Sequence, residues 1–358
     1  VTLNERSLEV RGSETRLERV PIAANLRHDQ LDGVVTEGWL ANSFGNDEQN
    51  ALLPAPVNRE QLSFLYKLAL HLKAEREEVR GKPETFSRPD YSFRLEGGTG
   101  DVPTGAERVL ITERRRGAPL DLMVAEAMIL ANSTWGQWLA SLGVPAIYRS
   151  QASLAPGVKV RMGAKALPHA GIGVPSYAWS TSPLRRYVDL VNQWQIIAAA
   201  RHGKTAALAA PFKPKDAQLF AIISAFDAAY SAYHGQQASM ERFWTLHYLR
   251  QQGITELTAT LLKEQGGGVW LVRAEKLPLT FNVLGAQGLP RGTRVRVKLG
   301  EIDDIALDVR GTVIDVLDPD MPVLDDDTDE DDAAAAGPLA IAVDVNETEA
   351  AGTDNPAP

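Results

Sequence analysis

Cysteine is absent from this 358-residue sequence, and its absence excludes disulfide bridges and thiolate zinc sites. The six histidines show none of the close spacings that metal ligands have. No run of eighteen apolar residues occurs, and the N-terminus lacks the basic and then apolar layout of a signal peptide. We therefore expect a chain without a membrane span, located by default in the cytoplasm. Its first residue is valine, which suggests a fragment of a longer protein.

A surplus of basic residues is also missing, since the formal net charge is -9. The charge is unevenly distributed, because residues 320–358 hold 12 acidic side chains and neither lysine nor arginine. The first 319 residues carry 34 acidic and 37 basic side chains, a net charge of +3. This part of the chain is therefore compatible with a phosphate-bearing partner, although so small a charge does not identify one.

The hydrophobic pattern predicts an α+β fold with long helices. Residues 59–80 carry apolar side chains at helical spacing and are followed by Gly81 and Pro83, which end a helix. In the helix expected over 119–142, one face is apolar and consists of Leu120, Val124, Ala127, Met128 and Ala131. Further helices are expected at about 31–40, 182–203 and 214–251, and short strands at 17–22, 86–95 and 107–111.

From Thr255 to Val316 the chain changes to short alternating stretches broken by glycine and proline, a pattern typical of a small β-barrel. The residues after it are too acidic and too poor in large apolar groups to fold. We therefore divide the chain into a first domain at 1–213, a connecting helix at 214–252, a barrel at 253–319 and a disordered acidic tail at 320–358.

The segment 169–190, HAGIGVPSYAWSTSPLRRYVDL, carries the most chemical information. Ser182 is typical of a helix N-cap and the proline after it of a first helical residue, so Arg185 and Arg186 would lie in the first helical turn. The helix dipole disfavours a cation there by roughly 0.3–1 kcal/mol, unless an anion binds the free N–H groups and the guanidinium groups together. The pattern favours a phosphate site. The alternative is that both arginines pair with surface carboxylates such as Asp189.

The same segment resembles the signature of the ribonuclease II / ribonuclease R exoribonucleases, the RNB family. The family pattern is His-x-Gly-Leu-Gly and then Tyr-x-x-Phe-Thr-Ser-Pro-Ile-Arg-Arg-Tyr-x-Asp-Leu, and this chain departs from it with Ser180 in place of the phenylalanine. The resemblance implies that Arg185 contacts the scissile phosphate and supports its hydrolysis. It also implies that Arg186 fixes the RNA backbone, and we expect Ser182 and Tyr187 of the same motif to contact RNA.

Two further stretches are similar to motifs of this family. VAEAMILAN at 124–132 matches Val-Glu-Glu-x-Met-x-x-x-Asn, which implies that Glu126 holds terminal nucleotides through ribose hydroxyls, a contact that distinguishes RNA from DNA. RPDYSFRL at 88–95 matches Arg-Pro-Asp-Tyr-x-Phe, which implies that Phe93 stacks on the last base without reading its identity. Considered without the family, Glu126 is a solvated helix residue, and Tyr91 and Phe93 are alternate strand residues that face a core.

The family hydrolyses RNA with magnesium held by a cluster of aspartates near the start of its catalytic domain. No such cluster precedes His28 in this sequence, so the chain itself is expected to hold no metal. Acidic residues do gather at 302–307 and 325–332, but the first stretch belongs to a barrel turn and the second to the tail. Neither is expected to reach Arg185 in a defined geometry.

The family also ends in an OB-fold that holds single-stranded RNA, and the barrel expected at 253–319 agrees with this. Basic side chains and an aromatic ring form the usual surface for a single strand on such a barrel. Each candidate is equally compatible with a solubilising role on the surface. The candidates are Lys263, Trp270, Arg273, Arg294, Arg296 and Lys298.

The resemblance implies a hydrolytic, magnesium-dependent, processive 3'-to-5' exoribonuclease that releases nucleoside 5'-monophosphates from single-stranded RNA. This chain would be its C-terminal part, completed by a missing N-terminal half of the catalytic domain. The alternative is a non-catalytic single-stranded RNA-binding protein on a decayed nuclease scaffold. A third possibility, a protein-interaction scaffold that works through the acidic tail, would show no affinity for RNA.

Overall fold

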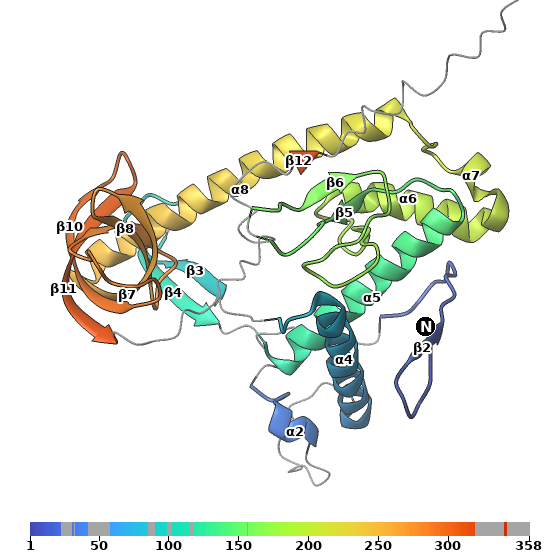
Figure 1. Cartoon of the computed structure of the whole chain (residues 1–358), viewed down its shortest axis with the longest axis horizontal. Coiled ribbons are helices and arrows are strands. Elements are labelled where there is room, and N and C mark those ends of the chain that lie inside the picture. The colour runs from blue at the N-terminus through green and yellow to red at the C-terminus, as the bar shows by residue number, and fades with distance from the viewer. Residues whose placement is uncertain are drawn as a thin grey trace, which may run out of the picture. The chain divides into compact units, whose positions relative to one another are not determined.

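The computed structural model describes residues 1–22, 31, 33–41, 58–84, 90–98, 102–114, 117–155, 157–318 and 340–341 (Figure 1). They belong to two units, which are described separately. The first comprises Val1–Glu84, Gly117–Ser231 and Asp329–Pro358, and the second comprises Thr85–Arg116 and Ala232–Thr328. The expected α+β fold with a small barrel is confirmed. The division into four segments remains a prediction.

The first unit is built mainly from helices. Its elements are β1 (Thr2–Leu3), β2 (Val10–Gly12), α2 (Glu37–Ala41), α4 (Arg59–Arg80), α5 (Pro119–Ser141), β5 (Tyr148–Ser150), β6 (Arg161–Gly163), α6 (Tyr187–His202), the 3-10 helix η1 (Gly203–Thr205), α7 (Ala206–Ala209) and the first part of α8 (Ala217–Gln251). Strands β1 and β2 pair antiparallel, as do β5 and β6. Strand β12 (Ala340–Ile341) pairs parallel with β6. The rest of the predicted tail, 320–339 and 342–358, lies outside the described residues.

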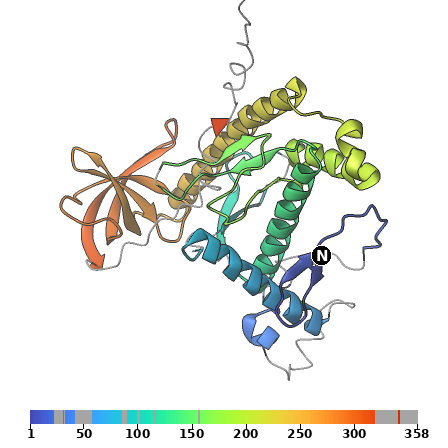
Figure 2. The same cartoon turned by 45° about the vertical axis from the view of Figure 1, so that its right-hand side comes forward.

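Helix α4 begins and ends as the sequence predicts, and Figures 1 and 2 show it beside the N-terminal half of α5. The Asn58 side chain accepts a hydrogen bond from the backbone N of Glu60 at 2.7 Å. Gly81 ends the helix in the left-handed conformation, with φ 77°, which glycine adopts without a steric penalty. Leu62 and Ala69 pack in a cluster with residues of α2 and α5. Helix α4 is thereby fixed against α5.

Helix α5 turns a different face to the interior from the apolar one that the sequence suggests. Val124 and Met128 are exposed, whereas Glu126 and Gly136 are buried. A Cβ at Gly136 would lie 3.0 Å from the Ser176 Oγ, so glycine allows a close approach of the two segments. The buried face mixes apolar and polar residues, and its Asn132 accepts a hydrogen bond from the backbone N of Ser180.

Three elements of the first unit differ from the expectation. Residues 17–22 form no strand, and Leu17, Val20 and Ile22 are exposed, because β-branched residues gain stability only where a partner strand and a core are present. Of the helix expected over 31–40, the structure describes α2, which begins at Glu37. The helix expected from residue 182 begins at Tyr187.

The second unit contains a hairpin and a five-stranded closed barrel, which Figure 2 shows from the side. Its elements are β3 (Asp90–Glu96), β4 (Arg108–Arg114), the second part of α8, β7 (Glu256–Gly266), β8 (Val269–Ala274), β9 (Thr280–Leu284), β10 (Arg294–Asp303) and β11 (Asp308–Asp318). The strand order is β10-β11-β9-β8-β7, and β10 closes the barrel by pairing with β7. Strand β11 pairs parallel with β9, and the other pairs are antiparallel.

The second part of α8 is tied to the barrel and to the hairpin by polar side chains. Arg242 donates to the backbone O of Leu307, to the backbone O of Thr280 at 2.7 Å and to Asp308 Oδ1 at 2.8 Å. Gln251 accepts from the backbone N of Val109 at 3.0 Å and donates to the backbone O of Glu107 at 2.7 Å. These contacts fix the ends of several strands to one helix.

We expect the turn before β4 to loosen in acid because of Glu107. Hydrogen bonds from the backbone and hydroxyl of Thr104 and from the backbone of Gly105 lower the pKa of Glu107 to about 2. A depressed carboxyl pKa contributes stability above the unfolded pKa of about 4.3, and this stability is lost as the pH falls towards 2. Amide exchange at Thr104 and Gly105 should therefore accelerate between pH 4.5 and 2 relative to the rest of the unit. In a Glu107→Gln variant the same amides should show no such pH dependence, and an unchanged profile would contradict the assignment.

Candidate functional site

The arginine pair lies in a turn that precedes α6, not in the first turn of the helix. Backbone N–H groups of Arg185 and Arg186 donate to the backbone O of Ser182 at 3.2 and 3.0 Å. Arg186 is the N-cap residue, has extended backbone (φ -127°, ψ 117°) and makes no side-chain cap. The prediction that Ser182 caps the helix is wrong, and so is the argument from the helix dipole that depends on it. Asp189, in the first turn of α6, instead holds the preceding turn, because its Oδ1 accepts from the backbone N of Ser182 at 2.8 Å.

Asp189 is fully buried and holds this turn on the helix. Besides the backbone N of Ser182, its Oδ1 accepts from Arg186 Nη2 at 2.8 Å. The alternative of a pairing between the arginines and Asp189 is therefore confirmed for Arg186, although Asp189 is an interior residue and not a surface one. A buried carboxylate with two donors fixes the geometry of its partners more closely than an exposed ion pair does.

Arg185 differs from Arg186 because it is exposed and its side chain makes no ion pair or hydrogen bond with any residue that the structure describes. Leu184 before it is fully exposed, and the ring of Tyr187 after it is half-exposed. Tyr187 meets Trp194 edge to face, with ring centroids 6.1 Å apart. The exposed Arg185 thus lies in the turn just before α6, and the two rings lie on the first two turns of that helix. The sequence analysis missed Trp194, although a spacing of seven residues from Tyr187 places both rings on one helix face.

Polar side chains of two helices hold the segment that leads into the turn. Asn132 of α5 accepts from the backbone N of Ser180 at 3.0 Å and donates to Thr181 Oγ1 at 3.3 Å. From α6, Gln193 donates to the backbone O of Ser180 at 2.6 Å and Asn192 donates to the backbone O of Trp179 at 2.7 Å. Asn132 is the last residue of the VAEAMILAN motif. The sequence therefore pointed to this residue but not to its contacts with Ser180 and Thr181.

Glu126 is buried, with 2% of its surface exposed, so the expectation of a solvated helix residue is wrong. Both of its oxygens accept from Arg76 of α4, at 3.0 Å for Nε. Arg76 also donates to Glu84 at 2.9 Å and to the backbone O of Ile172 at 2.6 Å. Burial by itself lowers the pKa of Arg76, but hydrogen bonds and charge from Glu126 and Glu84 raise it overall. The contact between Glu126 and ribose remains a prediction, and it would require this ion pair to open.

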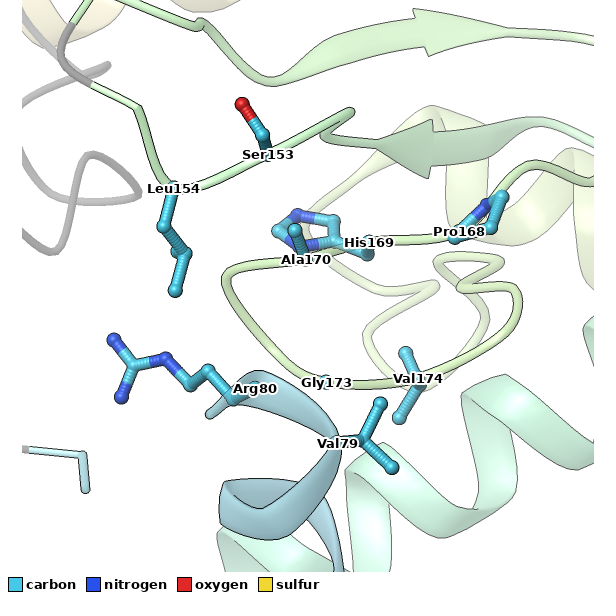
Figure 3. Close-up of a pocket in the computed structure, with 9 residues that line it drawn as sticks. All are labelled: Val79, Arg80, Ser153, Leu154, Pro168, His169, Ala170, Gly173 and Val174. Atoms are coloured by element: carbon cyan, nitrogen blue, oxygen red, sulfur yellow. The ribbon is translucent and has the colours of Figure 1, made fainter. Parts of the chain in front are cut away.

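The glycines of the HAGIG motif allow a loop to lie close to α4. Gly173 has φ +79°, and a Cβ there would lie 2.3 Å from the backbone O of Arg76. A cavity of about 370 Å³ lies beside this contact (Figure 3). Figure 3 shows Leu154 and the buried His169 on one side of the cavity and Val79 and Arg80 on the other. Its walls are mainly apolar, and Arg80 is the one cationic side chain among the described residues that line it.

Phe93 belongs to the second unit, on β3, whereas Arg185 belongs to the first. Tyr91, Phe93 and Leu95 alternate along β3 and are all partly buried, and Phe93 lies opposite Ile111 of β4. This is the arrangement of strand residues that face a core. The stacking of Phe93 on a base remains a prediction.

One residue that the sequence placed on the RNA-binding surface of the barrel, Trp270, is not on that surface. Trp270 alternates with Val272 and Ala274 on the inner side of β8 and is only 7% exposed, so it belongs to the barrel core and offers no ring to a base. Arg294 is engaged by both carboxylate oxygens of Glu275. Arg296 is exposed on the outer face of β10. Lys263 and Lys298 are also exposed, and Arg273 is half-buried.

Asp303 and Asp304 lie at the turn between β10 and β11, as the sequence predicts. Asp303 Oδ1 accepts from the backbone N of Ile305 and of Ala306, both at 2.9 Å, and these hydrogen bonds lower its pKa. Asp304 pairs with Arg250 at 2.9 Å. Within the described ranges, no group of three histidine, aspartate or glutamate side chains could hold a metal ion. None of the helices described there is long and apolar enough to cross a bilayer.

Residues 35–158 and 158–202 match the protein family described as RNB domain. Two curated proteins are similar to the chain. An uncharacterised ribonuclease of Synechocystis is 25% identical over 207 residues, which cover 51% of this chain and 30% of that protein. The chloroplastic/mitochondrial ribonuclease II of Arabidopsis thaliana is 26% identical over 322 residues, which cover 77% of this chain and 37% of that protein. The chain thus spans about a third of the length of these relatives.

Solved structures share the fold. The Dss1 exoribonuclease of Candida glabrata, an active-site mutant, matches with a TM-score of 0.57 and 17% identity, over 81% of this chain and 38% of that one. RNase R of Mycoplasma genitalium in its apo form matches with a TM-score of 0.57 and 15% identity, over 75% of this chain and 52% of that one. The same RNase R in complex with ribose-methylated single-stranded RNA has a TM-score of 0.56 and 15% identity, with the same coverage.

Proposed function

We propose that this chain, which belongs to the RNB family of ribonucleases, is the RNA-gripping part of a hydrolytic 3'-to-5' exoribonuclease that degrades single-stranded RNA to nucleoside 5'-monophosphates. Both curated relatives are ribonucleases. RNase R of Mycoplasma genitalium, which shares the fold, has been solved with single-stranded RNA bound. These similarities favour RNA as the partner. The side chains at and just before the start of α6 are of the types that bind RNA.

The observation that carries the proposal is the state of Arg185. Its guanidinium group is exposed and has no partner among the described residues. Asp189 binds the backbone of the turn, and Asn132 and Gln193 bind the backbone of the segment that leads into it. A guanidinium group that is not neutralised, on a turn whose backbone is held, suits a phosphate, which it binds through paired N–H donors. The rings of Tyr187 and Trp194 suit bases, because aromatic stacking tolerates every base.

The family also implies magnesium, which would supply an activated water and neutralise charge at the phosphate. The described residues do not fit such a site, since they contain no group of three side chains that could hold a metal. In this proposal the ligands belong to the missing N-terminal half of the catalytic domain. The residues of this chain bind and orient RNA, and Arg185 stabilises the charge that develops on the scissile phosphate.

We expect the purified chain to bind single-stranded RNA without hydrolysing it. Binding should weaken as salt rises, because each phosphate contact releases counterions, and Arg185→Ala should weaken it further. With magnesium and a 5'-labelled RNA, a gel should show intact substrate, since no group among the described residues generates the nucleophile. Release of mononucleotides by the purified chain would sink the claim that the metal site lies elsewhere. A chain that binds no RNA at all would sink the proposed function.

A non-catalytic RNA-binding protein is the alternative, and it makes the same prediction for this chain alone. A longer form of the protein separates the two, because a nuclease gains magnesium-dependent hydrolysis when the missing half is present. A longer form that binds RNA and leaves it intact would favour the binding protein.

A further inference from the structure

Two guanidinium groups lie over the indole ring of Trp179. The Cζ of Arg186 is 4.0 Å from the ring centroid, and the Cζ of Arg149 is 4.2 Å from it. Trp179 is 5% and Arg149 is 4% exposed, and the Arg186 side chain is also largely buried. A cation over an aromatic face is held more strongly in such a dry environment than at the surface. Trp179 belongs to a hydrophobic cluster of the core, and its ring also contacts two cations.

We propose that Trp179 is a positioning residue of the phosphate site. It holds Arg186, together with Arg149 of β5, so that the turn at 182–186 has one fixed geometry when RNA arrives. The inference rests on the proposed function and deepens it, because it concerns how the site is preorganised. Trp179 itself touches no phosphate, since its ring is buried.

Asp189 alone does not fix Arg186. Its Oδ1 receives one hydrogen bond from Arg186 Nη2, and the buried Nε of Arg186 has no hydrogen-bond partner among the described residues. An arginine side chain has several rotatable bonds and loses conformational freedom when it is ordered. The indole face compensates the charge and restricts the rotation of the guanidinium group at the same time.

The indole is itself held in place. Phe226 and Tyr230 of α8 meet it edge to face, with ring centroids at 6.4 and 6.0 Å, and they stack on each other at 5.1 Å. Asn192 fixes the backbone of Trp179 by donating to its carbonyl at 2.7 Å. These contacts fix the plane of the indole ring independently of the two arginines. An aromatic side chain that is fixed in this way can impose an orientation on its cationic neighbours.

The arrangement belongs to residues of this chain that its family pattern leaves open. Trp179 occupies an unspecified position of Tyr-x-x-Phe-Thr-Ser-Pro, directly before Ser180, which stands where that pattern has phenylalanine. In this chain an aromatic residue therefore stands one position before the phenylalanine of the pattern. Buried Ser180 now makes backbone contacts with Asn132 and Gln193 instead.

The test compares four variants of the full 358-residue chain: Trp179→Leu, Trp179→Phe, Arg186→Ala and Ile223→Ala. Ile223 is fully buried in the same cluster as Trp179, and Ile223→Ala serves as a control for lost packing. Thermal unfolding and the affinity for a labelled single-stranded RNA are measured at several salt concentrations. Trp179→Leu should weaken RNA binding roughly tenfold at low salt. It should also reduce the slope of log affinity against log salt concentration by the amount that corresponds to about one phosphate contact. Trp179→Phe, which keeps a ring, should weaken it roughly threefold.

Ile223→Ala should lower the unfolding temperature as much as Trp179→Leu does but leave the RNA affinity and the salt slope unchanged. If Trp179→Leu binds RNA no worse than Ile223→Ala while Arg186→Ala binds poorly, the positioning role is overturned and the proposed function stands. If the unsubstituted chain does not bind RNA, the proposed function fails instead. Should Trp179→Leu not fold, Trp179→Phe decides, and an affinity equal to that of the unsubstituted chain would overturn the role of the ring.

Discussion

Replacing Arg185 by alanine is expected to lower kcat for RNA hydrolysis by roughly 10²–10³-fold in whichever form of this protein degrades RNA. The affinity for RNA should fall far less, because the contact strengthens as charge develops on the phosphate in the transition state. The reason lies in the geometry, since Arg185 is exposed and its guanidinium is not neutralised by any described carboxylate. Single-turnover rates and equilibrium binding, measured on the same labelled RNA, separate the two effects.

A matched control is available on the same helix. Arg201 is an exposed arginine in the last turn of α6, so Arg201→Ala removes the same charge and should leave both rate and affinity nearly unchanged. Arg185→Lys keeps the charge but loses the planar pair of donors, and it should recover only part of the rate. An Arg185→Ala protein with normal turnover would remove the catalytic role and leave the phosphate-binding role of Arg186 to be judged separately.

Replacing Arg76 by methionine is expected to reduce the free energy of unfolding of the first unit by about 3–5 kcal/mol. Methionine has a similar volume, so the main loss is the ion pair, which leaves the buried Glu126 and the partly buried Glu84 without their cation. Urea unfolding, followed by circular dichroism, measures the change. The same substitution should also disturb the loop at Ile172, whose carbonyl accepts from Arg76.

A double variant shows whether the loss comes from an unpaired charge. Arg76→Met combined with Glu126→Gln removes both charges of the main pair, so it should be clearly more stable than Arg76→Met alone. Lys73→Met on the same helix removes a cation that pairs with Glu77 nearer the surface and should cost under about 1 kcal/mol. If Arg76→Met reduced the free energy of unfolding no more than Lys73→Met does, the buried pair would not be needed for the fold.

Local sequence determined those features whose causes lie within a few residues. Asn58 and Gly81 set the ends of α4, because capping depends on the backbone and side chain of the cap residue itself. The alternating stretches after Thr255 predicted the barrel strands, and the acidic pair at Asp303 predicted their turn. The arginine motif at 185–186 also gave the candidate site, because a guanidinium group suits phosphate by its own chemistry.

Tertiary structure alone decided which side of each element faces inward. Glu126 is buried because Arg76, fifty residues earlier in the chain, meets it, and Trp270 points into the barrel because the register of β8 turns it inward. The helix after Ser182 begins late because Asp189 binds the backbone of Ser182. The cations over Trp179 come from β5 and from the start of α6. The contacts of Arg76 with Glu126 and of Arg149 with Trp179 join residues that are distant in the chain, and no local propensity or spacing encodes them.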